Sequence, residues 1–175
     1  MRLFVAVAPE EKIRKQLCYA VDELQRAGGR GIFSSFDQLH LTLAFIGEAE
    51  QAEPVCSAMD ACPGRAFSLR LGGAGCFERS GGKTLWCSVE SSPVLISLQR
   101  QLSEQLYLAG FRVDTRPYLP HITLGRQVVL PEGFCLGAVS RLLPAMENSV
   151  QDIRLFSSSQ VMGKLTYTEL YRRLL

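Results

Sequence analysis

Histidine and lysine are both scarce in this sequence. The 175 residues contain only 2 histidines, His40 and His121, and only 4 lysines beside 15 arginines. The net charge of +2 is too small for a long nucleic-acid footprint, because such a surface neutralises many phosphates. The planar guanidinium of arginine suits phosphate ligands better than an ammonium group does, although a codon bias would produce the same excess of arginine.

Long apolar runs are absent as well. No run approaches the roughly 18 residues of a membrane-spanning helix, which argues against a membrane protein. The apolar segment at residues 2–8 is too short for a secretory signal, and Glu10 and Glu11 follow it at once, so we expect it to be a first strand. These features predict a cytoplasmic protein.

The six cysteines lack the spacing of a metal site. There is no Cys-x-x-Cys, and neither histidine lies near a cysteine at the spacing of zinc ligands. The sequence therefore predicts free, mostly buried thiols and no bound metal.

The remaining composition is that of an ordinary globular protein, with 47% hydrophobic and 21% charged residues. The length suits a single domain over residues 1–175, made of two lobes that share a core. Apolar periodicity predicts one helix between Pro9 and Gly28, a second over residues 51–61, and a third from Pro93 to Gly110. Strands are predicted at residues 2–8, 39–46, 67–71, 84–89, 121–126, 150–156 and 165–171, whereas residues 127–148 show no clear pattern. This mixture of hairpin-like strands and separate helices indicates an α+β fold.

Two glycine-rich segments resemble nucleotide-binding motifs but are incomplete. Gly82-Lys83-Thr84 lacks the earlier glycine of a P-loop, because Phe77 stands in that position. Gly73-Ala74-Gly75 lacks the third glycine of a dinucleotide fingerprint, because Glu78 stands there. We therefore expect turns at both segments and no nucleotide-triphosphate site.

The two histidines lie in matching motifs, His40-Leu41-Thr42-Leu43 and His121-Ile122-Thr123-Leu124. On a strand, side chains two residues apart share a face. Each histidine would then point to the same side as its threonine, while the aliphatic residues enter the core. If the two strands face each other across a cleft, they form a site of two imidazoles and two hydroxyls.

Such a site suits phosphodiester chemistry without a metal ion. One imidazole can take a proton from the attacking water or hydroxyl, and the other can protonate the leaving oxygen, because histidine titrates near neutral pH. The hydroxyls of Thr42 and Thr123 can donate hydrogen bonds to the phosphate oxygens on which charge accumulates. The alternative is that each motif is an ordinary half-exposed strand segment without a catalytic role. The presence of two matched copies argues against this alternative.

With these motifs, the sequence resembles the 2H phosphoesterases, which are defined by two His-x-Thr-x motifs. Among them it is similar to the RNA 2′,3′-cyclic phosphodiesterases, also called 2′-5′ RNA ligases. The resemblance spans nearly the whole chain: the opening segment at residues 2–7, the motif flanks at 39–48 and 116–126, and a closing hairpin around residues 157–167.

The resemblance implies a bilobal, pseudo-symmetric α+β fold with antiparallel sheets flanked by helices around a central cleft. It implies hydrolysis of RNA 2′,3′-cyclic phosphate ends to 2′-phosphates, with 2′-5′ ligation as the reverse reaction and no cofactor. His40 would be the proton donor and His121 the proton acceptor, although the two equivalent motifs do not separate these roles. The implied partners are RNA ends, tRNA fragments among them, and we expect a monomer.

Two further residues are candidate substrate-binding groups. Arg126 stands where the family often has an arginine that faces the phosphate, but strict strand alternation points it away from His121 unless Gly125 bends or bulges the strand. Tyr118 could stack on a terminal base, or it could be a structural aromatic.

Two other functions use the same residues. The substrate could instead be a small cyclic nucleotide, an ADP-ribose cyclic phosphate or a 2′-5′ oligonucleotide. The chain could also be a non-catalytic module that binds RNA ends. Turnover in the presence of a chelator, and its dependence on RNA length, would separate these hypotheses.

Overall fold

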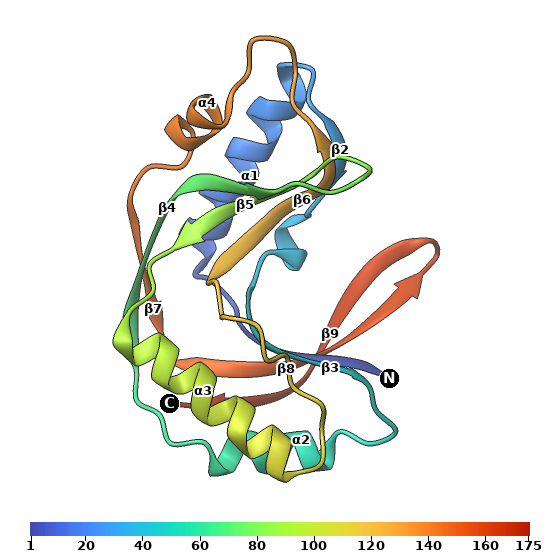
Figure 1. Cartoon of the computed structure of the whole chain (residues 1–175), viewed down its shortest axis with the longest axis vertical. Coiled ribbons are helices and arrows are strands. Elements are labelled where there is room, and N and C mark those ends of the chain that lie inside the picture. The colour runs from blue at the N-terminus through green and yellow to red at the C-terminus, as the bar shows by residue number, and fades with distance from the viewer.

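The structure, a computed structural model that describes all residues 1–175, is an α+β fold built on one curled antiparallel sheet (Figure 1). The predicted fold class is therefore confirmed. The strands are β1 (Arg2–Val7), β2 (Arg30–Phe33), β3 (Leu41–Glu48), β4 (Phe67–Phe77), β5 (Lys83–Val89), β6 (His121–Val129), β7 (Met146–Val150), β8 (Asp152–Val161) and β9 (Lys164–Leu174). The helices are α1 (Glu11–Arg26), α2 (Glu53–Ala61), α3 (Pro93–Leu108) and α4 (Leu136–Arg141), with a 3-10 turn η1 (Phe36–Gln38).

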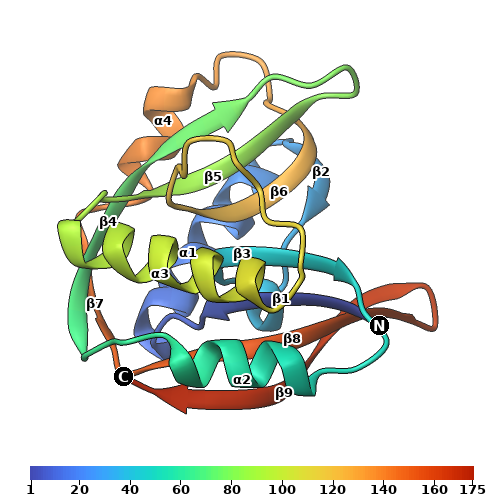
Figure 2. The same ribbon diagram turned by 60° about the horizontal axis from the view of Figure 1, so that its bottom comes forward.

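The sheet has two halves that meet at β3 and β6. Its strand order is β7-β4-β5-β6-β3-β1-β8-β9, and β2 pairs with β6 beside this path. We call β2 and β4 to β7, with α1 and α4, the β6 lobe. We call β1, β3, β8 and β9, with α2 and α3, the β3 lobe. Helices α2 and α3 lie side by side over the β3 lobe (Figure 2).

The long helices form where apolar periodicity predicts them. Helix α1 buries Ile13, Leu17, Ala20, Val21 and Leu24 on one face and ends before Gly28, whose φ of +100° favours glycine. Helix α3 begins at Pro93, and the Ser92 hydroxyl caps it by accepting a hydrogen bond from the Leu95 amide at 3.3 Å. Its leucines at positions 95, 98, 102 and 106 are buried as predicted, whereas Ala109 lies exposed at the end of the helix.

The predicted strands differ from the observed ones mainly at their ends. The turn predicted at Gly73-Ala74-Gly75 is wrong, because these residues lie inside β4, where Ala74 and Gly75 pair with β5. Strand β3 begins at Leu41, after His40, and continues through Gly47, which lies at an irregularity in the pairing with β1 and does not end the strand. The strand predicted at residues 150–156 is wrong in its first residues, because Gln151 separates β7 from β8. Residues 127–148 contain the end of β6, helix α4 and most of β7, none of which the sequence pattern indicated.

All six cysteines are free thiols. Cys62 and Cys87 are buried, three others are half-buried and Cys135 is exposed, so "mostly buried" overstated their burial. None of the helices combines the length and the apolar character that crossing a membrane requires.

Candidate active site

The two His-x-Thr motifs meet where the lobes join. Leu41 of β3 pairs with Ile122 of β6, the one residue pair that connects these antiparallel strands. Both side chains are buried, with 1% and 2% of their surface exposed, so the residues on either side of them face the opposite way. The antiparallel register then sets His40 across from Thr123 and Thr42 across from His121. This pairing brings the four motif residues together on strands that lie side by side in one sheet, whereas the prediction had the two strands face each other across a cleft.

The two imidazoles are held by equivalent hydrogen bonds. Nδ1 of His40 lies 2.7 Å from the Gln38 carbonyl oxygen, and Nδ1 of His121 lies 2.8 Å from the Leu119 carbonyl oxygen. Because a carbonyl can only accept, each Nδ1 carries the hydrogen and donates it. In both rings Nε2 is therefore the nitrogen left for a proton transfer.

The threonine hydroxyls are also available to a ligand. The side chains of Thr42 and Thr123 are half-buried, and neither hydroxyl makes a hydrogen bond within the protein. The backbone around them is fixed, since the Ser34 hydroxyl donates to the Thr123 carbonyl at 2.9 Å.

Each histidine packs against two aromatic rings from its own lobe. His40 contacts Phe4 of β1 and Tyr167 of β9, with ring centroids 4.8 and 5.3 Å apart. These two rings, and their counterparts around His121, were not predicted from the sequence, because they come from strands far apart in the chain. Only the uniqueness of the single tryptophan could have drawn attention to one of them.

The rings around His121 are Phe77 of β4 and Trp86 of β5, with centroids 5.4 and 5.7 Å from the imidazole. The Trp86 ring covers Gly75, where a Cβ atom would lie only 1.9 Å from a ring carbon. Gly75 is therefore needed for the approach of Trp86, which explains the glycine in the segment that resembled a dinucleotide fingerprint.

The protein groups around His40 disfavour its protonated form. Burial of the ring lowers its pKa from 6.5 to about 4, and the hydrogen bond to Gln38 opposes this effect. The positive charges of Arg126 and His121 lower the pKa of His40 further. A bound phosphate anion would act in the opposite direction on the same ring.

Arg126 lies close enough to His40 to influence it because β6 contains a bulge. Leu85 pairs with Gly125 and Trp86 pairs with Thr123, so two steps on β6 match one step on β5. Leu124 and Gly125 are both buried, and Arg126 returns to the face that carries His121 and Thr123. The bend that the sequence required at Gly125 is confirmed.

Gly125 also has no room for a side chain. A Cβ atom there would lie 2.9 Å from the Phe33 ring of β2 and 2.9 Å from Val128. The neighbouring strand β2, which the sequence did not predict, thus explains the glycine before Arg126.

Tyr118 occupies a structural position between the lobes. It is half-buried, and its hydroxyl donates a hydrogen bond to the Thr42 carbonyl oxygen at 2.9 Å. Burial raises the pKa of this phenol, so it remains protonated and able to donate. The contact fixes the first motif, whereas stacking on a base stays a prediction that no contact here supports.

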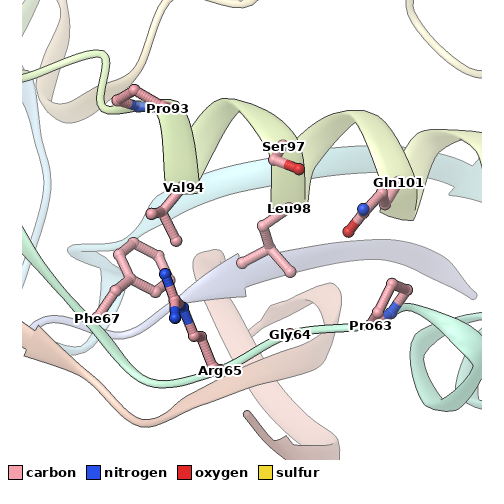
Figure 3. A pocket seen from close by; sticks show the side chains of 9 residues that line it. All are labelled: Pro63, Gly64, Arg65, Phe67, Pro93, Val94, Ser97, Leu98 and Gln101. Atoms are coloured by element: carbon pink, nitrogen blue, oxygen red, sulfur yellow. The ribbon is translucent and has the colours of Figure 1, made fainter.

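Two cavities stand out. One, of about 240 Å³, has His40 in its wall. The other, of about 430 Å³, lies between the start of α3 and the segment that leads into β4, where Val94 and Leu98 face Arg65 and Phe67 (Figure 3). This second cavity contains none of the motif residues.

Nowhere do three or more His, Cys, Asp or Glu side chains gather in a way that could hold a metal ion.

Known proteins share this architecture. Residues 9–161 match the 2′-5′ RNA ligase superfamily. The chain is 29% identical over 178 residues to the RNA 2′,3′-cyclic phosphodiesterase of Thermotoga maritima, covering 98% of this chain and 94% of that protein. It is 32% identical over 182 residues to the Escherichia coli protein of the same name, again covering 98% and 94%.

The fold agrees with these relationships. A crystal structure of Escherichia coli LigT complexed with 3′-AMP superposes with a TM-score of 0.79 at 31% identity, covering 99% of this chain and 97% of that one. The chain therefore belongs to the 2′-5′ RNA ligase superfamily, as a homologue of bacterial RNA 2′,3′-cyclic phosphodiesterases over nearly its whole length.

Proposed function

We propose that this protein hydrolyses RNA 2′,3′-cyclic phosphate ends to 2′-phosphates, using His40 and His121 for acid–base catalysis. The observation that supports this most is the matched pair of imidazoles, each with Nδ1 bound to a backbone carbonyl and Nε2 left for proton transfer. The family relationship supplies the substrate class. The proposal uses no metal ion or nucleotide cofactor, because the two rings carry out both proton transfers.

In the proposed reaction, Nε2 of His121 takes a proton from water while the water oxygen bonds to phosphorus. The bond from phosphorus to the 3′-oxygen breaks, and Nε2 of His40 gives its proton to that oxygen. The product is a 2′-phosphate with a free 3′-hydroxyl. With an RNA 5′-hydroxyl in place of water as the attacking group, the same steps in the same direction form a 2′-5′ linkage and free the 3′-hydroxyl.

The remaining motif residues act on the phosphate itself. The free hydroxyls of Thr42 and Thr123 donate to its non-bridging oxygens, where negative charge grows in the transition state. Arg126, on the same face of β6, adds a positive charge. The phosphate in turn raises the pKa of His40, so that this ring can be protonated when substrate is bound.

The test is turnover of an RNA that ends in a 2′,3′-cyclic phosphate, in excess EDTA, with the product identified by phosphorus NMR. We expect activity to persist and a 2′-phosphate to form. Loss of turnover that one divalent metal restores would contradict the two-histidine reaction, and a 3′-phosphate product would contradict the proposed bond cleavage.

Substrate length distinguishes the alternatives. Comparing a nucleoside cyclic phosphate, a dinucleotide and a tRNA-sized fragment, we expect kcat/KM to rise over the first few nucleotides and then level off. Turnover confined to mononucleotides would indicate a small-molecule enzyme, and binding without turnover would indicate a non-catalytic module.

A further inference from the structure

The smaller cavity borders His40 and lies in the half of the sheet that does not carry His121. Strands β1, β8 and β9 follow β3 in the direction away from β6, and they contribute Phe4, Phe156 and Tyr167 to the cavity wall. No residue of β6 lines it. The cavity thus shares only His40 with the four motif residues.

Its size and aromatic wall suit one nucleobase. The volume of about 240 Å³ falls below the range of roughly 300–1,000 Å³ that drug-sized ligands occupy. The Phe4 and Phe156 rings are stacked at a centroid distance of 5.3 Å, and Tyr167 meets Phe4 edge-on at 4.9 Å. Phe4 is only 3% exposed and supports the other two rings from behind, whereas Phe156 and Tyr167 are half-buried and provide the surface on which a base can stack.

Arg14 brings an unused hydrogen-bond donor to the cavity. Its guanidinium lies over the Phe36 ring, 4.2 Å from the centroid, and makes no ion pair. Its Nε atom is buried and has no hydrogen-bond partner. Because Nε is closed to solvent, a ligand in the cavity would meet the terminal nitrogens of Arg14, which also make no hydrogen bond within the protein and are free to donate.

The other charged groups of the cavity show what kind of ligand fits. Arg154 is already occupied, at 2.7 Å from Asp152 and 3.2 Å from Glu169. The exposed carboxylate of Asp37 makes no hydrogen bond or ion pair, so one acceptor and one donor remain for a ligand. Each nucleobase carries a donor beside an acceptor on its Watson–Crick edge. A wall with two arginines and two carboxylates also suits an uncharged base better than a second phosphate.

We propose that this cavity binds the base of the nucleotide that carries the cyclic phosphate, with the base edge between Arg14 and Asp37. The proposal rests on the function proposed above, because it takes the cyclic phosphate to lie between the two histidines. Since the unused donor and acceptor match every base, the cavity accepts all four.

This placement also bears on the roles of the histidines. Both ester oxygens of the cyclic phosphate belong to the ribose, so the ribose lies on the His40 side when its base is in the cavity. Attacking and leaving oxygens lie roughly in line at phosphorus. The leaving 3′-oxygen then lies toward His40 and the attacking water toward His121, which agrees with His40 as the donor.

The experiment compares nucleoside and base-free substrates. Adenosine and uridine 2′,3′-cyclic phosphates are assayed beside methyl riboside 2′,3′-cyclic phosphate, which has the same reacting group and no base. We expect kcat/KM for both nucleosides to exceed the base-free value by roughly 10- to 100-fold, mainly through KM. In Arg14→Gln this ratio falls about tenfold, whereas Arg26→Gln on the exposed end of the same helix keeps the wild-type ratio.

The outcomes separate this inference from the proposed function. Absence of turnover for every cyclic phosphate would contradict the function itself. Turnover with equal kcat/KM for nucleoside and base-free substrates, or an unchanged ratio in Arg14→Gln, would overturn only the base site. A loss in Arg14→Gln that requires a 5′-phosphate on the nucleoside would also overturn it, because Arg14 would then bind that phosphate. Melting temperatures of the variants confirm that they are folded.

Discussion

Leu41 and Ile122 form the one pair that joins β3 to β6, and this pair sets the register of the candidate active site. It places His40 across from Thr123 and Thr42 across from His121, so the site has an approximate two-fold symmetry. Each lobe then surrounds its histidine with two aromatic rings of its own. The symmetry extends from the backbone pairing to the hydrogen bonds of both imidazoles.

The threonines provide the first prediction. Thr42→Ala and Thr123→Ala should each lower kcat by roughly 10²-fold, because each removes one donor to the charge that develops on the phosphate. The pH profile should keep its bell shape, since both proton carriers remain. Thr42→Ser and Thr123→Ser keep the hydroxyl and serve as controls that retain most activity. Alanine variants with wild-type kcat would show that these hydroxyls do not contact the reacting phosphate.

The titration of His40 provides the second prediction. With a pKa of about 4, His40 is neutral at pH 7 in the free protein. Proton NMR of the two histidine rings should show one resonance that titrates near pH 4, and its absence in His40→Ala assigns it. Addition of inorganic phosphate should move that midpoint upward, because an anion favours the protonated ring. An unchanged midpoint would argue against a phosphate beside His40.

The same shift has a consequence for stability. In the unfolded chain His40 titrates near its ordinary pKa of about 6.5, so the unfolded state binds the proton first as pH falls. The contribution of His40 is therefore fully present above about pH 6.5 and is lost between there and pH 4, on the order of 3 kcal/mol. Urea unfolding at pH 7 and pH 5 should show a smaller pH dependence for His40→Ala than for the wild-type protein.

Gly75 provides the third prediction. In Gly75→Ala the new methyl group collides with the Trp86 ring, which must move away from His121. We expect kcat to fall and the fluorescence to shift, and the signal is simple to interpret because Trp86 is the one tryptophan. Gly137→Ala is the matched control, since its nearest new contact is an ordinary 3.6 Å from the Cys135 sulfur. Normal kcat and unchanged fluorescence in Gly75→Ala would contradict the role of Trp86 as support for His121.

Tyr118 provides the fourth prediction, which separates positioning from stacking. Tyr118→Phe keeps the ring and removes the hydrogen bond to the Thr42 carbonyl, which should cost about 0.5–1.5 kcal/mol of stability. If the hydroxyl positions the first motif, kcat falls while KM changes little. Tyr118→Leu should then behave like Tyr118→Phe. A large rise in KM in Tyr118→Leu alone would instead support base stacking.

The sequence predicts well which face of its strand each motif residue occupies, because that face depends on local geometry alone. Residues two apart on a strand share a face, so the directions of His40 and Thr42 follow from their spacing alone. Arg126 shows the limit of that rule. Its direction depends on a bulge at Leu124 and Gly125, where β6 pairs with β2 on one side and with β5 on the other, and these partners come from distant parts of the chain.

Elements that depend on distant contacts were not predictable in this way. Strand β7 contains Asn148, which is polar yet buried, because its side-chain oxygen accepts a hydrogen bond from the Glu10 amide at 2.7 Å. This contact breaks the apolar alternation that would have indicated a strand. The cavity beside His40 has the same origin, since Arg14 and Tyr167 lie at opposite ends of the sequence.

The central claim is that two histidines perform the two proton transfers. Both His40→Ala and His121→Ala should lower kcat by roughly 10²–10⁴-fold, and the double variant should lose less than the product of the two effects, because both rings act on one transition state. Each single variant should lose one limb of the bell-shaped profile of kcat/KM. In His40→Ala, residual activity that rises with pH would identify His121 as the acceptor, and activity that falls with pH would identify it as the donor.

The most direct measurement is kcat of His121→Ala beside its melting temperature, on a 2′,3′-cyclic phosphate substrate. The proposed chemistry predicts a fully folded variant whose kcat is lower by roughly 10²–10⁴-fold. A folded variant with near-normal kcat would contradict it, and so would activity that falls only in proportion to the amount of folded protein.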